Sequence, residues 1–573
     1  MSLSGTPSSV PQDYSLLAHY VGSYRERRHQ DVDRDVPTDD DLDDSEHLCP
    51  RRPIPTIPVS RVSAELPSRV AETTPLLNPP VPRIHEDVDA LSYDTRKATD
   101  VFWDEIKILT RYSLPVFGSH ILEHSMIMAS VISIGHISTI ALAAATLGFM
   151  TANVTGFSII QGMANTMDTI LPSAWTSDQP KLVGLWTQRM KLSCTYPVLA
   201  IWFNTESILL ALGQEPEIAR LAGIYLKWAS LGLPAYAFNA ISRRYFQSQG
   251  LFTIPTRIIL CVAPINIFLN YVLVWGPQPA RLGFIGAPIA SSISYNLVSI
   301  ASVIYGVFFV RKTAWHPITA KAFTNLGFLA KLSIGGVGQV ASSWWSWELC
   351  VSTPPFSLGP VPLASQSILI STSSSFFQAP YALGIAASVR IGNLLGEKNA
   401  KRAGVVVRAS FLLAVFLATL FSFTLLTMRN SWGYLFNDDP EVIQLVSAVL
   451  PLVALVEIFD NGSALVSGVL RARGKQILGA TLNIRQVVTN YRHIEICDYA
   501  YYVIGLPIGY WLTFMRDFQL TGLWWGLNVA MMCTTLIGLY LCFTTDWNRE
   551  VEKVIARLAV DKGYRPVDEE CAH

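Results

Sequence analysis

The sequence predicts an all-α integral membrane protein in which twelve transmembrane helices form two six-helix bundles related as parallel repeats. Three observations predict this fold: an apolar composition, apolar segments of membrane-spanning length, and a one-sided distribution of positive charge. Of the 573 residues, 50% are hydrophobic and 15% are charged, against about 25% charged in an average soluble protein. Lys+Arg and Asp+Glu balance at 43 each, which argues against nucleic-acid binding.

The chain consists of a polar tail over residues 1–103, an apolar region divided into an N-lobe (104–312) and a C-lobe (313–544), and a polar tail over 545–573. A helix needs about 20 apolar residues to cross the hydrocarbon core, and the apolar region contains twelve such segments. In chain order they lie at 106–133, 140–171, 192–212, 217–240, 254–275, 284–310, 326–351, 361–388, 403–427, 442–469, 477–514 and 521–544. An even number of spans places both tails on one side. Because the first 30 residues contain no apolar secretory signal, we expect that side to be the cytosol.

The predicted loops differ in charge. The loops on the side of the tails are rich in Lys and Arg, and they include Arg243, Arg244, Arg390 and Arg471. The loops on the opposite side contain few positively charged residues, namely Arg220, Arg281, Arg429 and Arg516. Because positive residues favour cytosolic loops, the asymmetry supports both the number of spans and the orientation.

The two halves of the apolar region resemble each other. "RYSLPVFG" at 111 recurs as "KLSIGGVG" at 331, and "GQEPEIARLAGIYL" at 213 recurs as "NDDPEVIQLVSAVL" at 437. Six helices per half give both repeats the same orientation in the bilayer. Parallel repeats place a substrate site between the halves and suit alternating access, so the pattern favours a transporter.

Several segments resemble a known family. They include "SIGHISTIALAAATLGFMTANVTGFSIIQGMANTMDTILPSAW", "SVRIGNLLGEKNAKRAG", "GVLRARGKQ" and "YYVIGLPIGYWL". Over about 104–548 the chain resembles the eukaryotic multidrug and toxic compound extrusion (MATE) transporters, particularly their fungal members. The resemblance implies a V-shaped pair of bundles that exports amphipathic, often cationic compounds against an inward proton or sodium gradient.

Acidic residues inside spans are costly and therefore indicate function. In "SSWWSWEL" of the seventh span, Glu348 follows Trp344 and Trp347. A carboxylate desolvated by indole rings binds a proton more readily, and indole faces attract cations, so a proton and a cationic substrate would compete there. The resemblance implies that Glu348 is the glutamate that relatives protonate. The alternative is a solvated residue near the lumenal end of the helix.

Asp460, in "VEIFDNGSAL" of the tenth span, resembles the acidic partner that relatives place opposite that glutamate. Its alternative role is that of a structural acid in a helix break. We expect Glu457, one turn earlier, to face the cytosolic vestibule or to pair with an arginine. Gln378, two residues before Pro380, places an amide beside a helix break in the eighth span, where it would line the substrate site.

Glu123 lies in the first span, where relatives commonly carry glutamine. His120, Glu123 and His124 share one helix stripe. Because no further ligands are evident, a metal site is disfavoured. We expect a polar lining of the N-lobe that supplies a second proton site. Asp168 is expected to be structural, tying the second span to a basic loop.

The eleventh span departs from the family pattern. The charged stretch 485–499 interrupts two apolar segments that relatives join directly. We interpret it as a retained intron or a gene-model error, which amplification of the transcript would test.

The N-terminal tail is proline-rich and acidic, and we expect it to be disordered. Within it, "ETTPLL" supplies Glu72, Leu76 and Leu77 as an acidic dileucine sorting signal for an adaptor. This signal favours the vacuolar membrane over the plasma membrane.

The function predicted from sequence is proton-coupled antiport that exports xenobiotics, organic cations or metabolites. A lipid or lipid-linked sugar flippase and a transport-dead receptor or scaffold are the alternatives. No P-loop or other enzyme motif is evident, so we expect no cofactor and no ATP; an ion gradient would supply the energy, with sodium as the alternative to the proton. The expected partners are a small-molecule substrate and the lipid bilayer.

Overall fold

A computed structural model describes residues 98–191, 196–211, 213–352, 360–436, 439–476 and 504–560. All regular structure in these ranges is helical. The chain divides into the units Met1–Pro80 and Val81–His573, and every described residue belongs to the second. The sorting signal at Glu72, Leu76 and Leu77 and the insertion at 485–499 lie outside the described residues.

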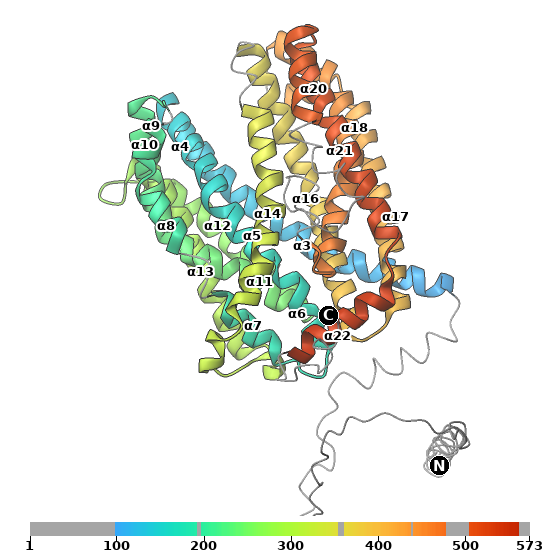
Figure 1. The fold of residues 1–573 in the computed structure, drawn as a ribbon. Helices are drawn as coiled ribbons and strands as arrows, with labels where there is room; N and C mark the ends of the chain where they lie inside the picture. The colour runs from blue at the N-terminus through green and yellow to red at the C-terminus, as the bar shows by residue number, and fades with distance from the viewer. Residues whose placement is uncertain are drawn as a thin grey trace, which may run out of the picture. The chain divides into compact units, whose positions relative to one another are not determined.

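The N-lobe begins with one long helix, α3, which runs through Pro115 without ending (Figure 1). The second predicted span is one apolar segment, Ile140–Thr176, interrupted by a π-helical turn. In chain order the elements are α3 (Ala98–Gly135), α4 (Thr139–Ala152), η1 (Asn153–Phe157), α5 (Ser158–Asn165), α6 (Met167–Thr176), α7 (Leu182–Lys191), α8 (Tyr196–Phe203), α9 (Thr205–Ala211), α10 (Pro216–Ala229), η2 (Ser230–Gly232), α11 (Leu233–Ser248), α12 (Thr253–Trp275), η3 (Gly283–Ile285) and α13 (Gly286–Phe308).

The C-lobe contains longer uninterrupted helices, drawn from yellow to red in Figure 1. After the short turns η4 (Lys312–Ala314) and η5 (Ala320–Phe323), its elements are α14 (Leu326–Ser352), α16 (Pro360–Gly396), α17 (Ala400–Thr427), η6 (Trp432–Leu435), α18 (Pro440–Ala472), α20 (Leu506–Tyr510), η8 (Trp511–Met515) and α21 (Gln519–Phe543). A last helix, α22 (Trp547–Val560), follows α21.

Local sequence explains where several helices begin. The Ser138 hydroxyl accepts a hydrogen bond from the Ala141 amide at the start of α4 (3.0 Å). At the start of α18, the Asp439 carboxylate accepts from the Glu441 amide (3.0 Å), and Pro440 occupies the first helical position. Both are typical capping arrangements, because short polar side chains satisfy the free amides of the first turn and proline has no amide to satisfy.

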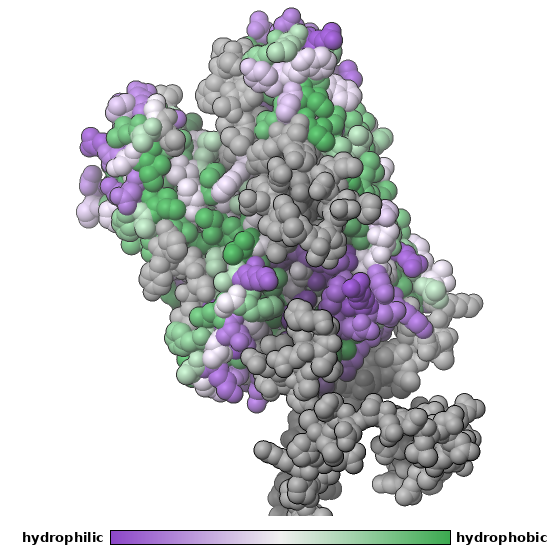
Figure 2. Space-filling view, in the orientation of Figure 1, coloured by the Kyte–Doolittle hydropathy of each residue, from purple (hydrophilic) through white to green (hydrophobic). Residues whose placement is uncertain are grey.

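Six described segments are long and apolar enough to cross a membrane. They are Ile140–Thr176, Thr253–Trp275, Gly283–Phe308, Ala400–Thr427, Pro440–Ala472 and Gln519–Phe543. Large apolar side chains on these segments remain exposed, among them Phe268 on α12, Phe308 on α13 and Phe423 on α17. Figure 2 shows hydrophobic residues over much of the outer face and hydrophilic residues toward the helix ends. Such an apolar exterior suits contact with lipid.

The lobes meet through close backbone packing at small residues. Helix α5 packs along α14, and α6 packs along α16. A Cβ added to Gly162 of α5 would lie 2.5 Å from the Val337 Cα, and one added to Gly396 of α16 would lie 2.5 Å from the Ser173 carbonyl oxygen. These glycines therefore permit the approach of the two lobes, as small residues do between membrane helices.

The N-terminal turns of α3 pack against the C-lobe helices α16 and α17 (Figure 1). Leu109 belongs to the same apolar core as residues of α16, α17 and α18. Glu105, which is fully buried, accepts two hydrogen bonds from Arg390 (2.8 and 2.9 Å) and one from Arg402 (2.5 Å). One end of α3 is thus anchored in the opposite lobe.

Helix α22 docks on the side of the lobes where the C-terminal tail begins. Val551 and Val554 enter the C-lobe core, and Leu558 contacts both the C-lobe core and the N-lobe core. Glu550 lies close to three cations: Arg473 (3.2 Å), Lys475 (3.6 Å) and Lys553 (3.0 Å). Burial raises the pKa of Glu550, but the cations outweigh burial and hold that pKa below its usual value.

Candidate functional site

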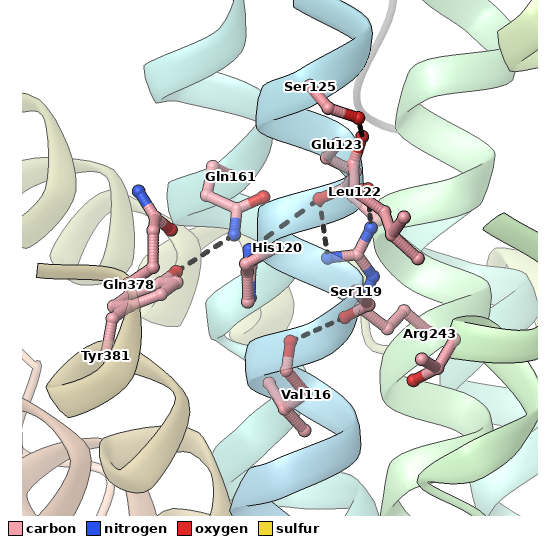
Figure 3. Close-up of polar contacts among 12 residues, drawn as sticks. Val116, Ser119, His120, Leu122, Glu123, Ser125, Gln161, Arg243, Gln378 and Tyr381 are labelled. Atoms are coloured by element: carbon pink, nitrogen blue, oxygen red, sulfur yellow. Dashed lines mark hydrogen bonds and ion pairs between the residues drawn. The ribbon is translucent and has the colours of Figure 1, made fainter. Parts of the chain in front are cut away.

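The N-lobe side of the site is an ion pair between α3 and α11 (Figure 3). Arg243 donates to both carboxylate oxygens of Glu123, with 3.1 Å between Nη1 and Oε2. The Glu123 side chain is 33% exposed, whereas the Arg243 side chain is 9% exposed. His120 Nδ1 lies 3.6 Å from the same carboxylate, beyond hydrogen-bonding distance. Glu123 and His120 thus share a face, as their spacing predicts.

The arginines assigned to cytosolic loops lie within helices, so that part of the sequence interpretation was wrong. Arg390 belongs to α16, Arg471 to α18, and Arg243 and Arg244 to α11. Helix α11 continues to Ser248 and buries both guanidinium groups. Each has an acidic partner inside the lobe: Arg243 pairs with Glu123, and Arg244 Nε lies 3.8 Å from Asp168 Oδ1. Pairing of this kind is what makes charged side chains tolerable inside a membrane protein.

Two residues of α16 connect this cluster to the C-lobe. The Tyr381 hydroxyl accepts a hydrogen bond from Gln161 of α5 (3.0 Å), and its ring packs edge-on against His120, with 5.2 Å between ring centroids. Gln378, one turn earlier, is half-buried and donates to the Ser374 carbonyl (3.1 Å). Figure 3 shows Gln378 and Tyr381 on α16 facing α3 and Gln161. The polar cluster therefore spans the junction of the lobes.

The C-lobe side of the site contains two acids on α18. Glu457 is fully buried and Asp460 is nearly so. Glu457 Oε1 accepts a hydrogen bond from Ser373 of α16 (2.8 Å), and Glu457 Oε2 has no partner among the described residues. The two acids are three positions apart on α18, so they share one face of the helix. No ion pair joins either acid to a cationic side chain in the described ranges. These acids lie midway along a 33-residue helix.

The described residues support neither expectation for Glu457. It does not face a vestibule, because its side chain is fully buried against α16. It does not pair with an arginine of the described chain either. The Ser373 hydroxyl takes that place, because a neutral donor satisfies a buried carboxyl group without adding a charge.

Helix α14 carries the predicted Glu348 and Trp347, but their side chains lie outside the described residues. Trp344 is half-buried. The next residue, Trp345, donates to the Val154 carbonyl in the π-helical turn η1 (3.2 Å), and Gln339 donates to Ser467 of α18 (2.8 Å). The helix predicted to carry the proton site is therefore bonded to both lobes.

A second buried cluster joins the lobes near α22. Asp168 of α6 lies between Arg244 of the N-lobe and Arg471 of the C-lobe, with 3.5 Å from Asp168 Oδ2 to Arg471 Nε. Thr169 donates to the Arg471 carbonyl (2.5 Å), and Gln476 donates to Thr169 (3.0 Å). Asp168 connects α6 to arginines of the helices α11 and α18 and not to a basic loop as expected. Arg471 follows it by about 300 residues, so no local pattern indicates the contact.

The arrangement gives the two lobes different chemistry. In the N-lobe, the acid is neutralised by Arg243. In the C-lobe, Asp460 and Glu457 have no cationic partner among the described residues. In the described part of the chain, no group of three or more His, Cys, Asp or Glu side chains is placed to hold a metal ion.

Comparisons with known proteins identify relatives across kingdoms. The MatE family model matches residues 115–272 and 343–492. An uncharacterized transporter of Schizosaccharomyces pombe is 32% identical over 84% of this chain and 90% of its own length. Protein DETOXIFICATION 12 of Arabidopsis thaliana is 32% identical over 81% of this chain and 94% of its own length. The Multidrug and toxin extrusion protein 2 of Mus musculus is 31% identical over 82% of this chain and 78% of its own length.

Solved structures share the fold. The crystal structure of the eukaryotic MATE transporter AtDTX14 superposes with a TM-score of 0.72 at 27% identity, over 80% of this chain and 100% of that one. An outward-facing MATE family transporter superposes with a TM-score of 0.67 at 14% identity, over 80% of this chain and 98% of that one. The twelve spans predicted from sequence are consistent with this fold. The chain therefore belongs to the MATE family, whose members are multi-pass membrane transporters of small molecules and not enzymes.

Proposed function

We propose that the protein is a proton-coupled antiporter that moves organic cations or amphipathic metabolites out of the cytosol. The observation that carries the proposal is the pair of buried acids on α18, Glu457 and Asp460, which have no cationic partner among the described residues. An unpaired carboxylate inside a membrane is costly. Such a site favours occupation by a proton or by a cation, and competition between the two is the basis of antiport.

The contacts between the lobes support a direction of transport. The Asp168–Arg471 contact and the docking of α22 lie on the side that the tails share. If that side is the cytosol, the described arrangement is closed to the cytosol. Protons then enter from the opposite side, bind the acids and displace the substrate. In this proposal, Trp344 of α14 and Gln378 of α16 provide the surface that an amphipathic ring contacts.

Uptake of a fluorescent organic cation into proteoliposomes under an imposed pH gradient tests the proposal. We expect gradient-driven uptake by the wild type, loss of uptake in Glu348→Gln and Asp460→Asn, and normal uptake in the control Glu441→Gln, whose side chain is exposed at the start of α18. Uptake driven only by a sodium gradient would overturn proton coupling. Absence of uptake across several cations would overturn the proposed substrate class.

The same assay addresses the insertion. We propose that a variant lacking residues 485–499 transports at least as well as the full chain, because the deletion joins two apolar segments into one span of ordinary length. A variant that loses transport after the deletion would show that these residues belong to the working protein.

We further propose that the protein resides in the vacuolar membrane and that the signal at Glu72, Leu76 and Leu77 directs it there. In cells, Leu76→Ala together with Leu77→Ala should move a fluorescent fusion to the plasma membrane. The pair Leu16→Ala and Leu17→Ala is the matched control, since no acid precedes Leu16 by four residues. Unchanged vacuolar fluorescence in the first variant would rule the signal out.

A further inference from the structure

A turn at the end of α18 directs two cations onto α22. The turn is made by Gly474, whose φ of +70° lies in the left-handed region that favours glycine. The Gly474 amide donates to the Arg471 carbonyl (3.0 Å), which satisfies one of the last carbonyls of the helix. The residues on either side of the glycine, Arg473 and Lys475, both approach Glu550 of α22 (3.2 and 3.6 Å).

Helix α22 adds two further cations to the same place. Glu550, Lys553 and Arg557 are separated by three and four positions and therefore share one face of α22. Lys553 Nζ lies 3.0 Å from Glu550 Oε1. A Cβ added to Gly474 would lie 3.1 Å from Arg557 Nη2, so this guanidinium rests against the glycine of the turn. We call the four cations the α22 basic cluster: Arg473, Lys475, Lys553 and Arg557.

One acid serves the whole α22 basic cluster in the described ranges. Arg473, Lys475 and Lys553 all approach the same carboxylate oxygen, Glu550 Oε1. Two guanidinium nitrogens, Arg473 Nε and Arg557 Nη1, are buried and have no hydrogen-bond partner among the described residues. Burial and the neighbouring Arg473 hold the pKa of Lys475 below its usual value, although Glu550 opposes that shift. The cluster therefore has both free donors and an excess of positive charge.

The cluster is accessible and lies close to the membrane surface. The side chains of Lys475 and Lys553 are 38% and 41% exposed, whereas that of Arg473 is only 5% exposed. Helix α22 is amphipathic and begins at Trp547, directly after the apolar helix α21 ends, which places it near the lipid headgroups. Buried guanidinium donors behind exposed ammonium groups suit a phosphate group, because the first supply directed hydrogen bonds and the second supply charge.

We propose that the α22 basic cluster binds the phosphate group of an anionic membrane lipid. The phosphate accepts hydrogen bonds from the free nitrogens of Arg473 and Arg557 and lies within reach of the two lysines, so it supplies the negative charge that Glu550 alone does not. Leu558 of α22 packs against the cores of both lobes. A lipid that holds α22 in place therefore also stabilises the contact between the lobes. This inference does not depend on the transported substrate or on the coupling ion.

The expected changes in affinity differ in sign between variants. Each Lys or Arg near a membrane surface strengthens the binding of an anionic lipid by about fivefold, so Lys553→Gln should weaken it by that factor. Glu550→Gln removes the carboxylate that competes with the phosphate and should tighten binding by about fivefold. Arg549→Gln is the matched control, because it also removes one exposed cation from α22 but lies outside the cluster.

The test uses the purified full-length chain in an uncharged detergent at pH 7. The midpoint of thermal unfolding, measured across concentrations of short-chain dioctanoyl phosphatidic acid, gives the apparent Kd, because a ligand that binds the folded state raises the midpoint. Dioctanoyl phosphatidylcholine is the matched lipid, whose choline cation opposes binding to a basic cluster. We expect phosphatidic acid to raise the midpoint of the wild type and of Arg549→Gln alike, and phosphatidylcholine to leave both unchanged.

The variants separate a phosphate site from a structural cluster. If the cations only anchor α22 through Glu550, Glu550→Gln would bind phosphatidic acid no more tightly than the wild type, and that result would overturn the proposal. Equal weakening in Lys553→Gln and Arg549→Gln would also overturn it, since it would indicate attraction by surface charge in general. Inorganic phosphate serves as the soluble arm. An equal shift with inorganic phosphate would retain the phosphate site and overturn the lipid as its source.

Discussion

The two lobes place acids inside the membrane in different ways. In the N-lobe, Glu123 is partly exposed and bound by Arg243. In the C-lobe, Glu457 and Asp460 are buried, and the only described donor to either is the Ser373 hydroxyl. Two repeats of one fold can therefore carry charge differently: one lobe holds an ion pair, and the other holds buried acids without a cationic partner among the described residues.

The greatest loss of transport should come from a substitution in the C-lobe. Asp460→Asn keeps the shape of the side chain but removes its ability to exchange a proton. We expect gradient-driven uptake to fall by on the order of a hundredfold, since the change removes a full charge from the site. Initial uptake rates in proteoliposomes measure it. Equal rates in Asp460→Asn and in the control Glu441→Gln would mean that Asp460 is not part of the site.

Substitution of an acid should also change the free energy of unfolding more in the N-lobe than in the C-lobe. Glu123→Gln leaves Arg243 buried without a counter-charge. Breaking a fully buried pair costs about 3–5 kcal/mol, and because Glu123 is one-third exposed we expect a smaller loss of about 2 kcal/mol. Thermal unfolding in detergent at pH 8 measures it, and Arg243→Gln in the same chain should recover most of it. No recovery would show that Glu123 is held by contacts other than Arg243.

The matching substitution in the C-lobe should have little effect on stability. Glu457→Gln keeps an oxygen that accepts from Ser373 and removes only a proton or a charge, so the free energy of unfolding should change by less than about 1 kcal/mol. Glu457→Ala, in contrast, leaves the Ser373 hydroxyl buried without a partner and should cost about 1–3 kcal/mol. A large loss in the Gln variant would indicate an ionised Glu457 with a cationic partner.

Glu550 of α22 lies outside the membrane-spanning helices and, like Glu123, is paired with cations. The pKa of Glu550 in α22 is lowered from 4.5 by Arg473 and two lysines that outweigh burial. A carboxyl group whose pKa is lower when folded contributes stability above its unfolded pKa and loses it as the pH falls through the folded pKa. Below about pH 4.5, wild-type stability should therefore fall more steeply than that of Glu550→Gln. Melting temperatures across pH 3–7 measure this small effect, and parallel curves would contradict it.

Most of the fold could be predicted from the sequence. Membrane spans follow from apolar length, and the family follows from segments such as "SVRIGNLLGEKNAKRAG", so the helical fold and the MATE family are confirmed. The roles of Glu348, Trp347 and Asp460 remain predictions. Helix ends were harder, because α11 extends to Ser248 past two arginines that composition alone assigns to a loop.

The partners of the acids could not be predicted, for a physical reason. Glu123 and Arg243 are 120 residues apart, and Asp168 and Arg471 belong to different lobes. Side chains within three or four positions on one helix are the ones that sequence spacing brings together. The stripe of His120 and Glu123 was therefore visible, whereas the arginine that neutralises Glu123 was not.

The anchoring of α3 affects how such transporters recombine. Glu105 precedes every other helix of the N-lobe in the chain, yet its carboxylate is bound by Arg390 and Arg402 of the other lobe. A chimera that joins the first half of one paralogue to the second half of another would pair this glutamate with foreign arginines. A chimera that takes residues 98–109 and the second half from the same paralogue keeps the contact. The boundary between the two exchangeable halves therefore lies inside the first helix.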